Sequence, residues 1–332
     1  MTIVRKDPAY LVIVAFAVAC GGSAAPPTAP GPITTPPGAQ GCARTSVGLT
    51  PLTDLAAGTY LGQAGGLYPG GGNTAPGAHL ASGMSLAASI GPLDRDGLPD
   101  PAGRYALISV GMSNTTQEFQ TFMPLASADA SRDPGLVIVD GAQGGQTAAD
   151  WADPGCACWT TLDNRLQQAG LTRAQVAVAW VKLANRQPSG DWPAATTQLK
   201  ADTVRVMQAL ATRFPNLRMA YLSSRIYAGY ATSTLNPEPY AYQGGFAVRW
   251  VIEDQLNGLL PFSGSSRGAP WMAWGPYLWA DGLTPRSDGL TWACGEFAED
   301  GTHPAAGGRQ KVGQLLLTFF QRDPTAREWY AR

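Results

Sequence analysis

The sequence has few charged residues and few histidines. Asp, Glu, Lys and Arg make up 14% of the 332 residues, and the formal net charge is -1. Lysine and arginine are scattered along the chain, so it lacks the basic runs of a nucleic-acid surface or a polybasic membrane patch. The only histidines are His79 and His303. A metal-dependent hydrolase would lack ligands, and we expect no metal ion and no cofactor.

Long apolar runs are also scarce, apart from one at the N-terminus. Arg5 and Lys6 precede the run 11–19, which is too short to span a bilayer and has the form of a signal-peptide core. The small residues before Cys20 resemble a bacterial lipobox, which implies lipidation of Cys20. We therefore assign residues 1–20 to a signal peptide and expect an exported envelope lipoprotein. Gly21 favours the outer membrane. The alternative is an ordinary signal peptide and a periplasmic or extracellular protein.

Residues 21–41 carry no charge and are rich in Pro, Gly, Ala and Thr. Such a composition cannot bury a core and is typical of an extended tether. A tether directly after a lipidated cysteine would hold the protein away from the membrane, so that the membrane is met only through the lipid anchor. We assign the remainder, residues 42–332, to a single domain.

Only five cysteines are present, and four remain if Cys20 is lipidated: Cys42, Cys156, Cys158 and Cys294. An even number in an exported protein predicts two disulfides. Cys156 and Cys158 are too close in sequence to bridge each other easily, so we expect each to pair elsewhere. A zinc site is the competing interpretation, but the spacing is unusual and no histidine lies nearby.

Short apolar runs predict four buried parallel strands. They cover residues 105–110, 136–139, 176–181 and 218–222. A helix is predicted over 194–213, with Asp202 and Arg205 facing water, and another over 308–320. Strands that alternate with helices indicate an α/β fold with a doubly wound parallel sheet.

Two regions carry weaker signals. Residues 43–103 are Gly-rich, and we expect them to wrap the sheet as irregular structure. Residues 225–300 are rich in Tyr, Trp and Pro, which suggests a long ordered insertion near the site, before the C-terminal helix. Ligands of doubly wound sheets bind at the carboxyl ends of the strands, so the residues just after each strand are the candidates for function.

A serine and a histidine occupy positions suited to nucleophilic catalysis. Ser113 follows the first strand after Gly111, although it could simply cap the next helix. Asp300 lies three residues before His303, where its carboxylate could bind the imidazole and fix its tautomer. His303 could then take a proton from the serine hydroxyl, which is a weak nucleophile without such a base.

Over residues 104–320 the chain resembles the SGNH (GDSL-like) hydrolases. The resemblance rests on Gly111-Met112-Ser113-Asn114, Gly141–Thr147, Leu183-Ala184-Asn185-Arg186 and Asp300-Gly301-Thr302-His303. It implies a flavodoxin-like fold, a Ser113, His303 and Asp300 triad, and an oxyanion hole. The oxyanion donors would be the amides of Ser113 and Gly145 and the side chain of Asn185.

The chain departs from the family pattern at three positions. Met112 replaces the usual Asp, and Leu183 and Arg186 replace the Gly and Asp that usually flank the third-block Asn. These changes put the third block in doubt more than the triad. Gly145 could be a plain turn glycine, and Asn185 a polar cap on its strand.

Other residues offer weaker candidates. Asn114, Gln146, Arg225 and Trp274 could contact substrate, although Arg225 could instead pair with Asp281 or Asp288, and the aromatic stretch 271–279 is more often core. His79 is expected to be structural. The string Gly264–Gly268 matches G-x-S-x-G but lacks a strand before it and a helix after it, so we expect a surface loop.

These features together predict an exported serine esterase that forms an acyl-Ser113 intermediate. The resemblance, the envelope location and the aromatic residues suit a small-molecule or glycan ester, with carbohydrate esters the most natural class. The rival interpretation is a non-catalytic glycan-binding lipoprotein with the same fold, which the departures around Met112 and Asn185 keep open.

Overall fold

A five-stranded parallel sheet forms the centre of the computed structural model, which describes residues 39–331. Its strands are β3 (Tyr105–Gly111), β4 (Leu136–Val139), β5 (Val176–Lys182), β6 (Met219–Ser223) and β7 (Trp271–Trp274). They lie side by side in the order β4-β3-β5-β6-β7. In chain order this is 2-1-3-4-5, the flavodoxin-like arrangement of a doubly wound sheet. The predicted fold class is confirmed.

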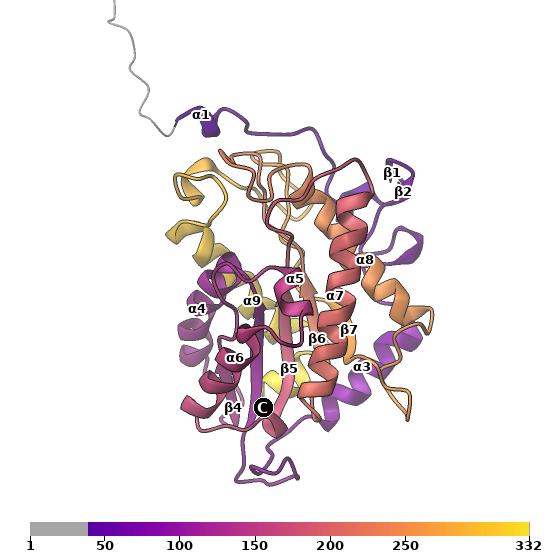
Figure 1. Ribbon diagram of the computed structural model, residues 1–332, viewed down its shortest axis with the longest axis vertical. Helices are drawn as coiled ribbons and strands as arrows, with labels where there is room; N and C mark the ends of the chain where they lie inside the picture. Colours follow the sequence, from indigo (N-terminus) through magenta and orange to yellow (C-terminus); the bar gives the residue numbers. More distant parts are fainter. Residues whose placement is uncertain (1–38, 332) are drawn as a thin grey trace, which may run out of the picture. The chain divides into compact units, whose positions relative to one another are not determined.

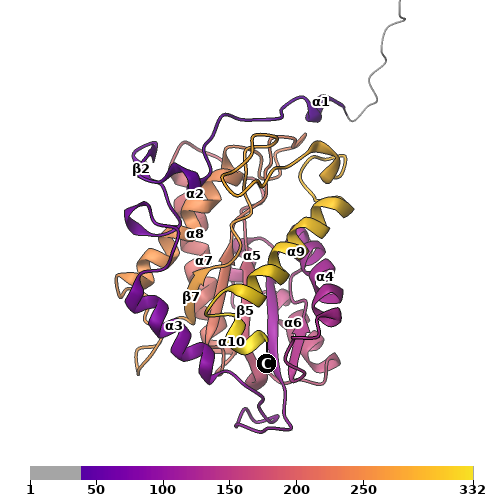
Figure 2. The same cartoon turned by 180° about the vertical axis from the view of Figure 1, so that it is seen from behind.

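Helices cover both faces of this sheet. Figure 1 shows one face, covered by α5 (Ala148–Ala152), α6 (Ala157–Gln168) and α7 (Ala194–Arg213). Figure 2 shows the other, covered by α3 (Gly77–Ser89), α4 (Ser113–Ala128), α9 (Ala306–Arg322) and α10 (Arg327–Tyr330). The helix α8 (Tyr240–Leu256) packs against α7 and β7. Both faces of the sheet are therefore shielded from water.

The remaining elements are short. They are α1 (Ala39–Cys42), α2 (Leu52–Leu55), the antiparallel pair β1 (Thr59–Tyr60) and β2 (Gln63–Ala64), and the 3-10 helices η1 (Pro69–Gly71), η2 (Arg173–Gln175) and η3 (Cys294–Glu296). Among residues 39–331, no helix has both the length and the apolar content needed to cross a membrane. The predicted signal peptide, Cys20 and most of the predicted tether lie outside the described residues.

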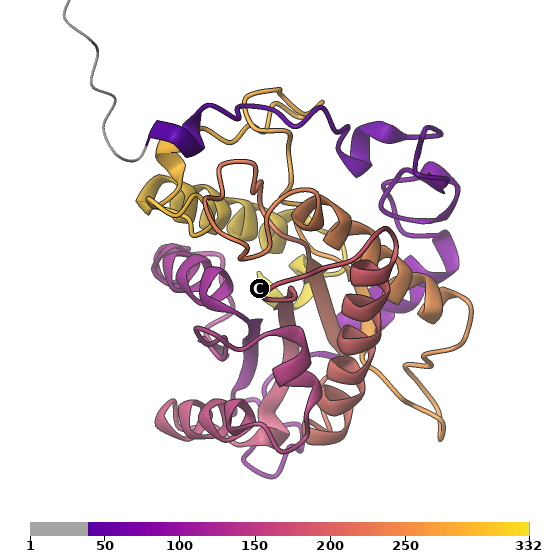
Figure 3. The ribbon, with the colours of Figure 1, turned by 45° about the horizontal axis from the view of Figure 1, so that its top comes forward.

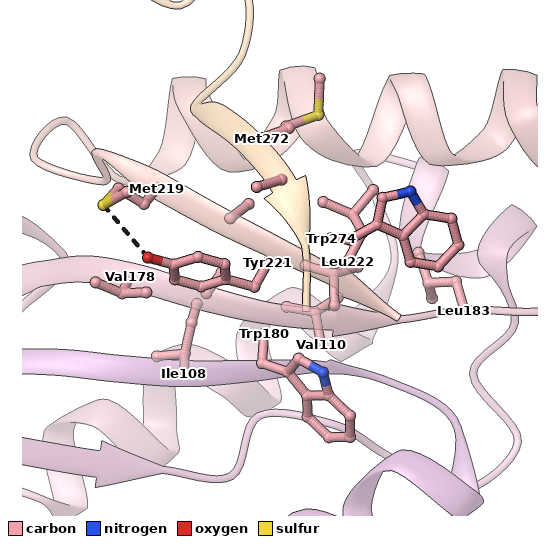
Figure 4. Packing of buried hydrophobic residues seen from close by; sticks show 14 of the residues in the cluster. Ile108, Val110, Val178, Trp180, Leu183, Met219, Tyr221, Leu222, Met272 and Trp274 are labelled. Atoms are coloured by element: carbon pink, nitrogen blue, oxygen red, sulfur yellow. Dashed lines mark hydrogen bonds between the residues drawn. The ribbon is translucent and has the colours of Figure 1, made fainter. Parts of the chain in front are cut away.

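The strands form because their residues are apolar on both sides of the chain. Every residue of β3, β5 and β6 is buried, as expected for parallel strands with helices on both faces. Figure 4 shows part of this core, where Ile108, Val178 and Tyr221 come from three adjacent strands. The hydroxyl of Tyr221 contacts the sulfur of Met219 at 3.7 Å. The sheet is thus a rigid platform for the loops that follow its strands.

The strand ends are in register, which places the site. Gly111 pairs with Lys182, and Lys182 pairs with Ser223. The segments that follow β3, β5 and β6 therefore leave the sheet at one edge. This edge lies at the top of Figure 1 and is turned toward the viewer in Figure 3.

Three expectations about the elements were wrong or incomplete. Asp202 does not face water: it is 1% exposed and pairs with Arg205 on the helix surface. Residues 225–300 are not only an insertion, because they contain α8 and the fifth strand, β7. Residues 43–103 are not wholly irregular, because α3 runs through them. The glycines and aromatic residues of these two regions hid the helix and strand patterns of α3, α8 and β7. These elements are buried by tertiary packing.

The described part of the chain contains two disulfides, one of which differs from expectation. Cys42 is joined to Cys294, and Cys156 is joined to Cys158. The prediction that Cys156 and Cys158 pair elsewhere was wrong. Cys156 is the residue that directly precedes α6, and Cys158 lies in the first turn of that helix; their Cα atoms are 5.2 Å apart. That separation lies within the range of disulfides.

Candidate active site

Ser113 is set by a tight junction between β3 and α4. The strand ends at Gly111, Met112 is extended, and Ser113 is the first residue of α4. A Cβ atom at Gly111 would lie 2.3 Å from the carbonyl oxygen of Lys182, so only glycine fits at this close approach. The serine is partly exposed at the carboxyl edge of the sheet.

Three side chains form a continuous chain of hydrogen bonds at this edge. Ser113 Oγ is 2.7 Å from His303 Nε2, and His303 Nδ1 is 2.5 Å from Asp300 Oδ2. The other carboxylate oxygen of Asp300 accepts from the backbone amides of Thr302, at 3.0 Å, and His303, at 2.9 Å. The carboxylate thus orients both the ring and the backbone of the histidine.

A glycine allows this turn. Gly301 has φ +61, and a Cβ atom there would lie 1.9 Å from the carbonyl oxygen of Tyr230. The turn is closed by a bond from the Ala298 amide to the His303 carbonyl, at 2.8 Å. Beyond it, α9 begins at Ala306. The Asp-x-x-His segment is therefore held between a packed loop and a helix.

The hydrogen bonds to Asp300 also set its charge. Burial alone would raise the pKa of Asp300, but bonds from the amide and ring of His303 and the amide of Thr302 outweigh it. The net effect holds the pKa of Asp300 below its ordinary value. The carboxylate is therefore ionised at neutral pH, as is required to stabilise a protonated imidazole.

The residues predicted as oxyanion donors lie on neighbouring loops. The amide of Gln143 donates to the Gly111 carbonyl at 3.0 Å, and the amide of Ala148 donates to the Ala184 carbonyl at 3.1 Å. The loop that carries Gly145 is thus attached on one side to the end of β3 and on the other to the segment after β5. Gly145 itself is exposed and has φ +81, a conformation that favours glycine.

Asn185 is engaged with its surroundings. Its side-chain amide donates to the Ala195 carbonyl in the first turn of α7 at 3.2 Å. Its backbone carbonyl accepts from the side-chain amide of Asn236 at 3.0 Å. An amide nitrogen carries two hydrogens, so one remains for another acceptor. The oxyanion roles of Gly145 and Asn185 stay predictions.

Two residues predicted to contact substrate lie against the turn Asp300–His303. Asn114 and Arg225 are 2% and 4% exposed, and both donate to the carbonyl oxygen of Thr302, at 2.9 and 3.3 Å. The alternative partners proposed for Arg225 were wrong. Asp281 accepts from the segment 46–48, and Asp288 pairs with Arg286.

The other two residues predicted to contact substrate, Trp274 and Gln146, lie in other segments. Trp274 is 4% exposed in β7, where its indole donates to the Leu67 carbonyl at 2.7 Å, so the core interpretation of this stretch holds. Gln146 is partly exposed in the loop that carries Gly145. The string Gly264–Gly268 lies in a mostly exposed loop, with no strand before it.

A buried ion pair lies beneath the site, and sequence reasoning missed it. Lys182, at the end of β5, binds Glu118 of α4 at 2.6 Å, and both side chains are almost fully buried. Burial lowers the pKa of Lys182 to about 8 and raises that of Glu118. A signal was available: Glu118 falls on the same helical face as Thr115 and Phe122, which are both buried.

Within residues 39–331, no group of three or more His, Cys, Asp or Glu side chains is arranged to hold a metal ion. The hydrogen-bonded groups of the site are a hydroxyl, an imidazole and a carboxylate. Together they can remove a proton from the hydroxyl and return it to a leaving group.

No family model and no curated protein matches the chain. Solved structures resemble it weakly. A Bacillus subtilis protein is 11% identical, with a TM-score of 0.39 over 67% of this chain and 58% of its own. A gut microbial diltiazem-metabolizing enzyme is 16% identical, with a TM-score of 0.38 over 70% and 48%. The periplasmic domain of a lipopolysaccharide acetyltransferase from Salmonella ser. Paratyphi A is 13% identical, with a TM-score of 0.38 over 74% and 94%. The chain spans about half the length of the first two.

Proposed function

We propose that this protein is a serine ester hydrolase with Ser113 as its nucleophile. The observation that carries the proposal is the chain of hydrogen bonds from Ser113 Oγ through His303 to Asp300. In this arrangement the base lies within hydrogen-bond reach of the nucleophile, and a third group orients the base. Ser113 is partly exposed, as a nucleophile that must meet a substrate has to be.

The reaction has two halves. His303 Nε2 takes the proton of Ser113 Oγ as the oxygen attacks the acyl carbon, and the imidazolium then gives this proton to the departing alcohol. An acyl-Ser113 ester remains. His303 next takes a proton from water, the resulting hydroxide attacks the ester, and the acid leaves as Ser113 regains its proton.

The oxyanion of each tetrahedral intermediate needs donors that are already in place. The amides of Ser113 and Gly145 and the side chain of Asn185 are the candidates. Ser113 is the first residue of a 16-residue helix, so its amide is among those that have no partner within the helix, and the helix dipole favours negative charge there. We propose carbohydrate esters as the substrate class, on the basis of the predicted envelope location.

Identification of the residue that a fluorophosphonate labels tests this proposal directly. The purified protein is incubated with a fluorophosphonate and digested, and the labelled peptide is identified by mass spectrometry. Hydrolysis of p-nitrophenyl acetate, butyrate and octanoate and of an acetylated xylan is measured in parallel. We expect the label on Ser113, and we expect Ser113→Ala to lose both labelling and turnover.

Ser266→Ala is the matched control, since Ser266 is the central serine of the G-x-S-x-G string in the exposed loop. It should behave like the wild type. A label on Ser266, or full turnover by Ser113→Ala, would refute the assignment. A folded wild-type protein that hydrolyses none of the esters and takes no label, yet binds the glycan, would favour the non-catalytic alternative.

A further inference from the structure

The peptide bond between Thr302 and His303 is held from both of its sides. On its nitrogen side, the His303 amide donates to Asp300 Oδ1 at 2.9 Å. On its oxygen side, the Thr302 carbonyl accepts from Asn114 Nδ2 at 2.9 Å and from the Arg225 guanidinium at 3.3 Å. The orientation of this peptide plane sets the direction in which the His303 side chain leaves the backbone.

The donor on Asn114 belongs to the same rigid element as the nucleophile. Ser113 and Asn114 are the first two residues of α4, whereas Thr302 lies 188 residues further along the chain. A bond from Asn114 to the Thr302 carbonyl therefore fixes the base-bearing turn relative to the serine. The two atoms that must meet, Ser113 Oγ and His303 Nε2, are held at 2.7 Å.

At this buried position an asparagine that only fills space would be less favourable than an apolar residue of similar size. The Asn114 side chain is 2% exposed, and its Oδ1 atom has no hydrogen-bond partner among the described residues. Burying such an atom without a hydrogen bond is unfavourable, and a leucine of similar size would avoid this penalty. The donor on Nδ2 is the feature that an apolar residue could not supply.

Arg225 provides the second donor and a buried positive charge. It is 4% exposed and lies just beyond the end of β6. Burial lowers its pKa, while the negative charges of Glu118, Glu238 and Asp300 act in the opposite direction. Its bond to the Thr302 carbonyl is longer than that of Asn114, at 3.3 Å against 2.9 Å.

We propose that Asn114 and Arg225 are positioning residues that lock the Thr302–His303 peptide and thereby keep the imidazole in line with Ser113. This inference rests on the proposed function of Ser113 and His303. Neither side chain needs to touch the substrate. We call these two donors, Asn114 and Arg225, the clamp. Loosening the clamp should slow the chemical step and leave substrate binding nearly unchanged, because a displacement of about 1 Å can cost about 100-fold in rate.

The test compares Asn114→Leu with Gln175→Met. Gln175 is also buried, and its side-chain amide also donates to two backbone carbonyls, those of Leu93 and Arg104, at the opposite end of the sheet. Both variants should lower Tm. Only Asn114→Leu should lower kcat, by about 10–100-fold, with KM within about threefold of the wild type and fluorophosphonate labelling slowed in proportion.

Arg225→Lys keeps the charge but loses the reach of the guanidinium, so we expect a smaller loss of kcat. The two donors share one acceptor, so the double variant Asn114→Leu/Arg225→Lys should lose less than the product of the single effects. Asn114→Asp, which keeps the shape and replaces the donor with an acceptor, gives a second test if Asn114→Leu does not fold. It too should lower kcat at constant KM.

The outcomes separate this inference from the proposed function. The assays are run at a temperature well below the Tm of every variant. If Ser113→Ala abolishes turnover but Asn114→Leu and Asn114→Asp have the same kcat as Gln175→Met, the clamp is refuted and the assignment of the nucleophile stands. If the loss appears in KM alone, Asn114 contacts substrate and the clamp is again refuted. If Ser113→Ala keeps its activity, the proposed function itself has failed.

Discussion

The two histidines of this chain occupy opposite kinds of surroundings. His303 lies at the carboxyl edge of the sheet, and each ring nitrogen contacts a side chain of a different chemical type, a hydroxyl and a carboxylate. His79 lies in α3, 8% exposed, with its ring stacked on Trp271 and its Nε2 bound to the Met272 carbonyl at 2.8 Å. The first ring can exchange a proton; the second is part of the packing.

The surroundings also act differently on charge. Burial lowers the pKa of His79, so its neutral form is favoured in the folded protein. His303 instead has its Nδ1 atom against the carboxylate of Asp300, at 2.5 Å. Residue type alone therefore says little about function. The partners of both ring nitrogens decide what a histidine can do.

The largest expected difference is in activity. His303→Gln should lower kcat for ester hydrolysis by about 10⁴–10⁶-fold, since the serine then has no base. His79→Gln should leave kcat within about threefold and lower the stability of the fold, because the stacked ring is lost. Steady-state kinetics and thermal unfolding of both variants check this. Equal losses of activity in the two variants would overturn the distinction.

Removing the charge beside His303 should have the next largest effect. Asp300→Asn leaves the nucleophile and base in place but no longer fixes the tautomer or stabilises the imidazolium, so we expect kcat to fall by about 10³–10⁴-fold. Asp288→Asn is the control, because that carboxylate pairs with Arg286 away from the triad. An Asp300→Asn enzyme as active as this control would show that the carboxylate has no catalytic role.

A smaller effect is expected at the predicted oxyanion donor. Asn185→Ala should lower kcat by about 10²–10³-fold, the usual range for one donor, with little change in KM. Asn216→Ala serves as the control, since the Asn216 amide donates to the Gly97 and Ala174 carbonyls instead. If the two variants differ only in stability, Asn185 is the polar cap that its bond to Ala195 already makes it.

The smallest expected effect is the pH dependence of stability at His79. Its folded pKa lies below the unfolded value of about 6.5, so the unfolded chain binds the proton first on acidification. The free energy of unfolding should therefore fall as pH decreases from about 7 through this window. His79→Gln should lack this component of the slope. Denaturant unfolding at a series of pH values measures both, and a steeper slope in the variant would contradict the sign.

Much of the fold was predictable because the strands are continuous apolar runs. The predicted strands and those of the structure agree to within one residue at each end, and the helix Ala194–Arg213 begins and ends as expected. The strand β7 was missed because its four residues sit among prolines, glycines and other aromatics. Helix α8 was missed for a similar reason, since Gly244 and Gly245 lie within it.

Within the candidate site, the Asp300–His303 pair was predictable from local geometry, whereas the Ser113–His303 contact, which spans 190 residues, was expected only from the resemblance of the motifs. Asp300 and His303 are three residues apart, so one turn brings them together, and Ser113 follows directly from the end of a strand. The contacts of Asn114 and Arg225 with Thr302 span 188 and 77 residues. No pattern in the sequence reports them, because they depend on how the finished sheet brings its loops together.

The disulfide between Cys42 and Cys294 makes a covalent ring of most of the chain, because it spans 252 residues. The exposed loop that contains Ser263 and Ser266 lies inside this ring. A protease that cut there would open the ring without separating the pieces, and both would stay linked through the sulfur atoms. The serine and the histidine, which fall on opposite sides of such a cut, would still belong to one molecule.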